Sequence, residues 1–354
     1  MRTTSTVFGK FTIVVAAFVG LLFATNGARA QSSSANELDI KPTTFDHDQA
    51  ESAKTAYRHA HPANTAAGQE LRARQTALRK PSKDSMPADD GGIVTYEGDL
   101  SNQGGEVVTT TVFHAIYMRV GGKCPIATCW GDPEGFLRDL GDSNFIHLAD
   151  QYVGLHSSNR YTVGFHAKVN YTPPVVPLID TDIQAVVHAV AMASGDTGYG
   201  HMYHVFLPPG QDECFDSTFT QCYSPNSPAV FFYCAYHSSV DFTDIGHVVY
   251  SVEPFQNVPG CQVEPGTPNG SLVDSTDNVL NHETFEAISD PDGTAWFNTT
   301  SLPLFGSEDG DECAFITFVG PNAYFNPPTF KINGHSYAVQ SIYSNDVHAC
   351  GTAP

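Results

Sequence analysis

Basic residues are scarce in this chain of 354 residues. It has 17 Lys and Arg against 38 Asp and Glu, which gives a formal net charge of -21. Binding to nucleic-acid phosphates needs clustered basic side chains, so this composition argues against a nucleic-acid partner. The shortage is greatest in residues 91–354, where 29 acidic residues face 6 basic ones. Such an acidic region either keeps an extracellular protein soluble or binds cations.

Long apolar runs are also absent from most of the chain. No segment after the first 30 residues has about 20 uninterrupted apolar residues, so we expect no membrane span after signal cleavage. Residues 1–30 have the layout of a secretory signal, with a basic start, an apolar run from Phe11 to Ala24 and Ala28-Arg29-Ala30 at the cleavage site. An uncleaved membrane anchor is the alternative. We expect a secreted, extracellular protein, exported directly or by way of the periplasm.

Several catalytic signatures are missing. The sequence has no G-x-S-x-G nucleophile motif, no phosphate-binding glycine loop and no dinucleotide fingerprint, which argues against the enzymes that depend on them. Charged residues make up 16% and hydrophobic residues 41%, too little charge for a coiled coil and too much apolar content for a disordered chain. The paired carboxylates of a glycoside hydrolase have no sequence signature, so the sequence leaves this class of enzyme open.

Composition divides the chain into three parts. Residues 1–30 are the signal peptide. Residues 31–90 are polar, rich in Ala, Thr, Ser and Gln, and lack cysteine, as expected of a pro-segment or linker that buries little apolar surface. A short helix is expected there at about Gln69–Leu78. Residues 91–354 hold both tryptophans and all eight cysteines, and we expect them to form a single acidic domain.

Helical and extended patterns alternate in the acidic domain, so we expect an α/β (α+β) fold around one sheet. Alternating or β-branched runs predict strands at Val107–Met118, Tyr161–Tyr171, Met202–Leu207, Ala229–Tyr236, His247–Val252 and Tyr337–Tyr343. Apolar spacing and capping residues predict helices that begin at Asp132-Pro133 and Thr181, and a third over Asp274–Ser289 that ends at Asp290-Pro291.

The third helix carries the most informative string, His282-Glu283-Thr284-Phe285-Glu286. Residues at i and i+4 lie on the same helix face, so His282 and Glu286 can bind one ion. The string resembles H-E-x-x-H, in which two histidines bind zinc and the Glu is the general base, but Glu286 replaces the second histidine. The alternative is a solvated amphipathic helix that packs its apolar side, including Leu280 and Ile288, on the sheet.

A third ligand has to come from the helix end or from a later loop. The candidates for this third ligand are Asp290, Asp292 and the acidic loop Glu308-Asp309-Gly310-Asp311-Glu312-Cys313. A His, Glu and Asp set adds two negative charges, which weakens zinc as a Lewis acid and also suits calcium or manganese. Histidines such as His201, His204, His237, His335 and His348 are expected to be packed or exposed residues rather than ligands.

Five motifs stand out along the acidic domain: His282-Glu283-x-x-Glu286-Ala287-x-x-Asp290-Pro291, Ala295-Trp296, Gly310-Asp311-Glu312-Cys313, Phe231–His237 and Asn333-Gly334-His335-x-Tyr337. Together they resemble the EXORDIUM / phosphate-induced protein family, especially its secreted bacterial members. The resemblance covers roughly residues 105–350, in the family's order. It implies a zincin-like mixed sheet with a His-Glu helix beneath it, with His282, Glu286 and Asp311 as metal ligands and Glu283 as the catalytic base.

Proximity and this resemblance together suggest four disulfides. The pairs are Cys124/Cys129, Cys214/Cys222, Cys234/Cys261 and Cys313/Cys350, one of the 105 connectivities that eight cysteines allow. The last pair would tie the Asp311 loop to the final strand. Disulfides rather than a thiol nucleophile are expected in an exported protein.

Two functions follow as hypotheses. The first is a secreted zincin-like metalloprotein with zinc, or else calcium or manganese, which acts as a peptidase through a metal-activated water and Glu283. The second is a non-catalytic, EXORDIUM-like extracellular or cell-surface protein with a structural metal or none. Its partner would be a cell-wall polymer or a peptide, since cell-wall growth is what the family's plant members are associated with.

Overall fold

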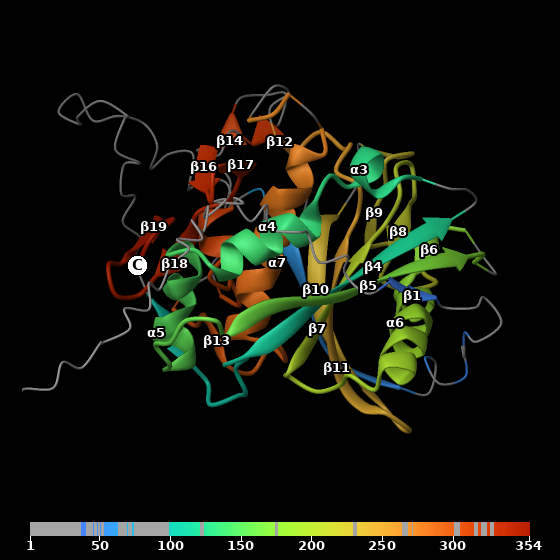
Figure 1. Ribbon diagram of the computed structural model, residues 1–354, viewed down its shortest axis with the longest axis horizontal. Helices are drawn as coiled ribbons and strands as arrows, with labels where there is room; N and C mark the ends of the chain where they lie inside the picture. Colours follow the sequence, from blue (N-terminus) through green and yellow to red (C-terminus); the bar gives the residue numbers. More distant parts are fainter. Residues whose placement is uncertain are drawn as a thin grey trace, which may run out of the picture. The chain divides into compact units, whose positions relative to one another are not determined.

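The computed structural model contains a mixed seven-stranded sheet that organises the acidic domain (Figure 1). The order of the strands across the sheet is β1 (Glu37–Asp39), β5 (Tyr161–Tyr171), β4 (Thr111–Val120), β7 (His201–Phe206), β11 (Gly246–Glu253), β10 (Tyr233–Phe242) and β2 (Lys54–Pro62). The first five strands of this order are parallel to one another, and β10 is antiparallel to both of its neighbours, β11 and β2.

The structure describes most of the chain from residue 99 onward. The gaps in that part are 121–123, 174–175, 229–231, 264–267, 271, 301–304, 315–317, 320–323 and 326–328. Before residue 99 it describes 37–39, 53–62 and the single positions 45, 48, 50, 69 and 73. The expected signal sequence and most of the helix expected at 69–78 lie outside the described residues.

Both edge strands of the sheet come from the polar segment 31–90. At one edge β1 pairs in parallel with β5, and at the other β2 runs antiparallel along β10, from Lys54 opposite Asp241 to Pro62 opposite Tyr233. The segment therefore adds backbone hydrogen bonds to the sheet, although it has few apolar side chains that could pack in the core.

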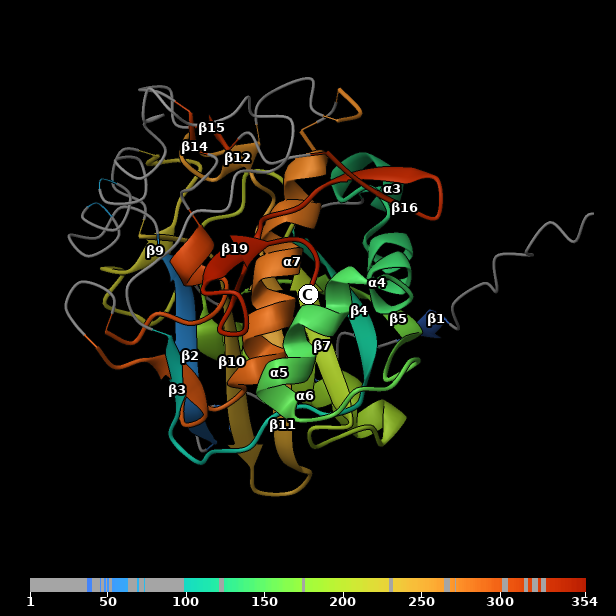
Figure 2. The same cartoon turned by 90° about the vertical axis from the view of Figure 1, so that its left-hand side faces the viewer.

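Helices cover both faces of the sheet (Figures 1 and 2). On one face α6 (Asp180–Ser194) packs Ile183, Val186 and Val190 against alternate strand residues, and it ends at Gly195 with a φ of 81°. The other face is covered by α4 (Pro133–Gly141), the 3-10 helix η2 (Phe145–Ala149), α5 (Asp150–Val153) and α7 (Asp274–Ser289). Strand side chains point alternately to the two faces of the sheet. Because helices cover both faces, both sets of side chains are buried.

Helix α7 has the bounds that the sequence predicts. It is buried along its whole length, and it ends where Asp290 precedes Pro291. Its apolar residues Leu280, Phe285 and Ile288 join the core cluster that includes α4 and η2. Its side with His282 and Glu286 faces β10 and the 308–313 segment rather than water, so the alternative of a solvated helix is wrong.

Most other predicted elements occur, with shifted ends. The Asp132 side chain accepts a hydrogen bond from the Gly135 backbone N–H and so caps α4. The strand expected at Ala229–Tyr236 is β10, whose described part begins and ends later, and the one expected at Tyr337–Tyr343 is interrupted. The shorter elements are α3 (Ile126–Cys129), the 3-10 helix η3 (Asp311–Cys313), β3 (Leu100–Asn102), β6 (Leu178–Ile179), β8 (Glu213–Cys214), β9 (Cys222–Tyr223), β12 (Gln262–Val263), β13 (Trp296–Asn298), β14 (Phe318–Val319), β15 (Tyr324–Phe325), β16 (Thr329–Ile332), β17 (His335–Ala338), β18 (Ile342–Ser344) and β19 (Ala349–Gly351).

All eight cysteines lie in disulfide pairs, with Cα atoms 4.0 to 6.1 Å apart. The pairs are Cys124–Cys129, Cys214–Cys222, Cys234–Cys261 and Cys313–Cys350, which confirms the suggested connectivity. Four disulfides fit an oxidising compartment and hence an exported protein. Among the residues that the structure describes, no helix is both long and apolar enough to cross a membrane.

Candidate metal centre

The structure brings His282, Glu286 and Asp311 together in the core. Nε2 of His282 lies 2.9 Å from Oε1 of Glu286 and 3.6 Å from Oδ1 of Asp311. One ligand atom from each of the three lies within 4.8 Å of the others. His282 and Glu286 are fully buried and Asp311 is 3% exposed. Two donor atoms at about 2.0–2.2 Å from one zinc ion are roughly 3.0–3.6 Å apart, so these spacings suit a shared cation.

Gln340 fixes the His282 ring. Its side-chain N–H donates to the Gly310 carbonyl at 2.7 Å, and both ends of the amide lie near Nδ1 of His282, with Nε2 at 3.0 Å and Oε1 at 3.2 Å. When Oε1 accepts from Nδ1–H, the lone pair on Nε2 of His282 faces the two carboxylates. That tautomer is the one that a metal-binding histidine adopts when a neighbour holds its other nitrogen.

The 308–313 segment lies directly against α7. The Asp311 backbone N–H donates to Oε1 of Glu286 at 3.0 Å, and the Tyr343 N–H donates to the Asp309 carbonyl at 2.8 Å. At Gly310 the approach is so close that a Cβ would sit 2.7 Å from His282 Nδ1 and 2.9 Å from Glu286 Oε1. Only glycine fits there without a shift of the segment, and the Cys313–Cys350 disulfide anchors its far end.

His237 belongs to the same cluster, although the sequence gives no reason to choose it. It extends from β10, is fully buried, and its Nδ1 lies 3.4 Å from Glu283 Oε2 and 3.6 Å from Glu286 Oε2. Its Nε2 lies 3.7 Å from Glu308 Oε2. A lone histidine in a strand carries no spacing signal, and only the packing of α7 on β10 shows its neighbours.

Fully buried carboxyl groups surround these ligands. Burial, reinforced by the charge of Glu286, raises the pKa of Glu283 well above its usual range, and the same two causes raise the pKa of Asp309. Burial also raises the pKa of Glu253 to about 8. None of the six Lys or Arg of residues 91–354 lies in α7, β10 or the 308–313 segment. The ionised cluster therefore needs protons or metal cations to neutralise it.

The other two candidates for the third ligand, Asp290 and Asp292, make contacts outside this triad. Asp290 follows α7, and its Oδ1 accepts hydrogen bonds at 2.7 Å from the backbone N–H groups of Thr294 and Ala295. Asp292 accepts from the Tyr199 hydroxyl and lies 3.3 Å from Nε2 of His247. Of the acidic positions that the sequence leaves open, Asp311 is thus the one that completes a triad with His282 and Glu286.

A comparison with known protein families, curated proteins and solved structures finds no match for this chain. The functional interpretation therefore rests on the side chains of the cluster and their surroundings.

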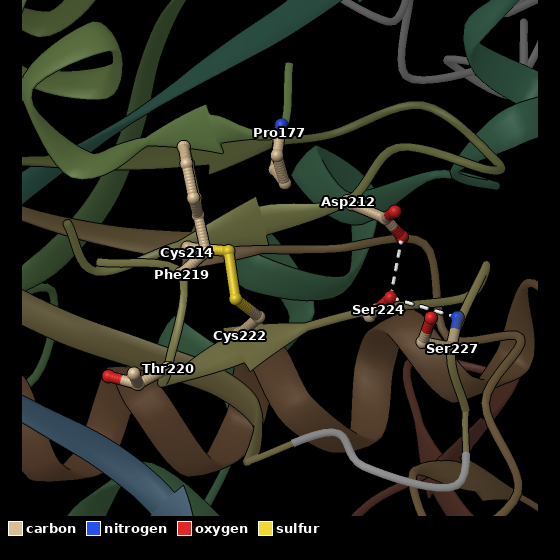
Figure 3. A pocket seen from close by; sticks show the side chains of 8 residues that line it. All are labelled: Pro177, Asp212, Cys214, Phe219, Thr220, Cys222, Ser224 and Ser227. Atoms are coloured by element: carbon tan, nitrogen blue, oxygen red, sulfur yellow. Dashed lines mark hydrogen bonds between the residues drawn. A yellow bond between two sulfur atoms is a disulfide. The ribbon is translucent and has the colours of Figure 1, made fainter. Parts of the chain in front are cut away.

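Two features lie apart from this cluster. His114, Asp196 and His201 form another group with one ligand atom each within 4.8 Å, and His114 Nε2 lies 3.1 Å from His201 Nδ1. A pocket of about 390 Å³ lies beside the Cys214–Cys222 disulfide, with Asp212 accepting a hydrogen bond from the Ser224 hydroxyl (Figure 3). No residue of the acidic cluster lines this pocket.

Proposed function

We propose that this protein is an exported metalloprotein that binds a divalent cation in its core through His282, Glu286 and Asp311. The observation that carries the proposal is the 2.9 Å separation between Nε2 of His282 and Oε1 of Glu286. In the tautomer in which Nδ1–H donates to Gln340, both facing atoms are hydrogen-bond acceptors. Two buried acceptors this close repel each other unless a proton or a metal ion lies between them.

Binding of the ion would join two parts of the chain that are distant in sequence. Helix α7 supplies His282 and Glu286, and the disulfide-anchored 308–313 segment supplies Asp311. Since metal binding to the folded state stabilises it by mass action, the ion would hold this segment on the helix. The set of one imidazole and two carboxylates suits zinc, and its oxygen content also suits manganese or calcium.

A metal-dependent hydrolase, such as a peptidase, is the second function that we propose to test. The observation in its favour is that Glu283 lies close enough to Glu286 and Asp311 for their charges, in addition to burial, to raise its pKa, and its carboxyl lies 3.4 Å from His237. A bound divalent ion would supply Lewis acidity, and Glu283 would accept the proton of the attacking water. Each ligand is at most 3% exposed, however, so a peptide could reach them only after the 308–313 segment moved. Burial thus favours a structural ion over a catalytic one.

The zincin-like and EXORDIUM-like interpretations belong to the same proposal. A His-Glu helix packed on a mixed sheet is the arrangement that a zincin-like protein needs, and an EXORDIUM-like protein with a structural ion needs no open cleft. In the second case the acidic surface would bind a cell-wall polymer or a peptide. Retained partner binding without hydrolysis over a broad substrate panel would favour it, and robust peptide cleavage would rule it out.

Elemental analysis of the purified full chain tests metal binding. We expect a divalent metal in the wild-type protein, a lower metal content in His282→Ala, and an unchanged content in the control His335→Ala, because His335 is exposed and pairs with Asp139. A wild-type protein that stays metal-free after incubation with zinc, manganese and calcium would overturn the proposal.

Hydrolysis is tested separately, with casein and peptide turnover by the wild type and Glu283→Gln. We expect the variant to keep its metal and lose turnover if Glu283 is the base. Equal turnover by the two proteins would remove Glu283 from the mechanism.

A further inference from the structure

We propose that the centre holds two divalent cations rather than one, with the Glu286 carboxylate bridging them and with His237 and Glu308 completing the second site. This inference rests on the proposed function, because it places a second ion beside the first. The two sites would share Glu286 and no other residue.

The two oxygens of Glu286 face two different sets of ligands. Oε1 lies 2.9 Å from His282 Nε2 and accepts from the Asp311 N–H, whereas Oε2 lies 3.6 Å from His237 Nδ1. A carboxylate that presents one oxygen to each of two ligand sets has the geometry of a bridging ligand. In two-metal sites the ions are about 3.5–4 Å apart, a separation that one carboxylate spans.

The second set of ligands also converges, although less tightly than the first. One ligand atom from each of His237, Glu286 and Glu308 lies within 4.8 Å of the others, and all three residues are fully buried. Glu286 Oε2 lies 3.6 Å from His237 Nδ1, whereas Glu308 Oε2 and the Asp290 carbonyl lie 3.7 and 3.3 Å from Nε2 of the same ring, so an ion bound through one nitrogen would draw the other carboxylate closer. The histidine comes from β10 and the two glutamates from α7 and the 308–313 segment, so three separate elements converge.

Glu283 provides an independent indication of a cation at this second position. It is fully buried, and among the described residues its carboxylate has no side-chain hydrogen-bond donor, only a backbone contact with His237. Its Oε2 instead faces His237 Nδ1 at 3.4 Å, beyond the usual range for N–H···O hydrogen bonds. A buried carboxylate aimed at a ligating histidine is what a cation beside that histidine would stabilise.

Charge balance favours two ions over one. A single divalent ion at the first site balances the charges of Glu286 and Asp311, and Glu283 and Glu308 are also fully buried. A second divalent ion would supply the positive charge that balances these two carboxylates when they are ionised. Buried charges are retained in proteins when they are paired or bind metals, so the two-ion centre accounts for more of the buried carboxylates.

The test is metal stoichiometry of the full chain in a His201→Ala background, which removes the separate His114, Asp196 and His201 group. After dialysis against buffered Zn²⁺ or Mn²⁺, we expect two equivalents in this background and one when His237→Gln is added. Glu308→Gln should also reduce the count to one, and it replaces His237→Gln should that variant fail to fold by circular dichroism.

The outcomes separate this inference from the proposed function. Two equivalents that fall to one in either variant support the bridged pair, and so does exchange-broadened electron paramagnetic resonance of the Mn²⁺-loaded protein. One equivalent in the background, unchanged by His237→Gln and Glu308→Gln, overturns the second ion and leaves the first site standing. No bound metal overturns both.

Discussion

The side chain of Gln340 holds the imidazole of His282 through Nδ1, at 3.2 Å, while its amide N–H is bonded to the backbone of Gly310. One amide thereby fixes both the ring and the segment that faces it. The orientation of the His282 ring is thus set by a residue that follows it by 58 positions.

Replacement of Gln340 should weaken metal binding without removing a ligand. In Gln340→Ala the ring loses its partner at Nδ1, and such second contacts are worth about 10- to 100-fold in metal affinity. Competition titration with a chelator measures the change. Gln211→Ala is the control, since its amide donates to the Asp212 carbonyl outside the cluster. Equal affinities for wild type and Gln340→Ala would contradict the role of Gln340.

Gly310→Ala should disturb the centre by steric overlap. The new Cβ would lie 2.7 Å from His282 Nδ1, so the 308–313 segment has to retreat from α7 and take Asp311 with it. We expect a loss of about 1–3 kcal/mol in unfolding free energy and weaker metal binding. Gly200→Ala is the matched control, because its Cβ would meet nothing within 4 Å. Urea unfolding of both variants, with and without metal, gives the comparison.

Loss of the Cys313–Cys350 disulfide should affect both stability and metal affinity. The bond closes a loop with a sequence separation of 37, for which chain entropy gives about 4 kcal/mol, against about 2 kcal/mol for the separation of 5 in Cys124–Cys129. Double serine variants of each pair can be compared by denaturant unfolding. Only the Cys313→Ser, Cys350→Ser variant should also bind metal less tightly, since it alone frees the Asp311 segment. Equal metal affinity in the two variants would argue against that anchoring role.

Chelation should lower the thermal stability of the wild type by more than that of His282→Ala. An ion that binds only the folded state adds about 2.7 kcal/mol at a free concentration of 100 times Kd. Melting curves with and without excess chelator, recorded at equal protein concentration, show the difference. A wild-type melting temperature indifferent to chelator and to added metal would speak against an ion in the core.

Acid should destabilise the fold through His204, which is fully buried between β4 and β11. Burial lowers the pKa of His204 to about 3, so the folded protein keeps it neutral while the unfolded chain binds a proton near pH 6.5. Stability attributable to this residue therefore decreases as pH falls from 6.5 toward 3, by at most about 1.4 kcal/mol per pH unit.

The measurement is the difference in unfolding free energy between the wild type and His204→Gln at pH 7 and pH 4.5. The wild type should lose more stability than the variant over this interval. His156→Gln is the control, because the His156 side chain is 77% exposed. An identical pH dependence in wild type and His204→Gln would contradict the prediction.

Much of the fold can be predicted from the local sequence, because the spacing of apolar residues and the capping residues determine elements such as α7 and β5. Helix α7 has apolar spacing and a proline after Asp290, and β5 alternates from Tyr161 to Tyr171. Strand β10 continues past Tyr236 through Ser238 and Ser239, whose burial comes from neighbours in the sheet and not from their own polarity. The edge strands β1 and β2 likewise depend on partners that composition does not show.

The metal centre can be predicted only in part, because some of its residues come together only through the packing of elements that are distant in sequence. His282 and Glu286 are four residues apart on one helix, and spacing alone places them together. Asp311 follows from the family resemblance and not from spacing. Glu308 lies in the acidic loop that the sequence leaves open as a source of ligands, whereas His237 has no sequence relation to α7, so only the packing of β10 on the helix reveals it.

The order of these groups along the chain also governs when the centre can be completed. His237 and α7 are synthesised first, Asp311 and Gln340 follow, and Cys350 comes 37 positions after its partner Cys313. A nascent chain lacks half of this set until late in synthesis, and the closing disulfide forms only under oxidising conditions. The ion would then be captured where the chain finishes folding, so its identity would depend on which metals that compartment supplies.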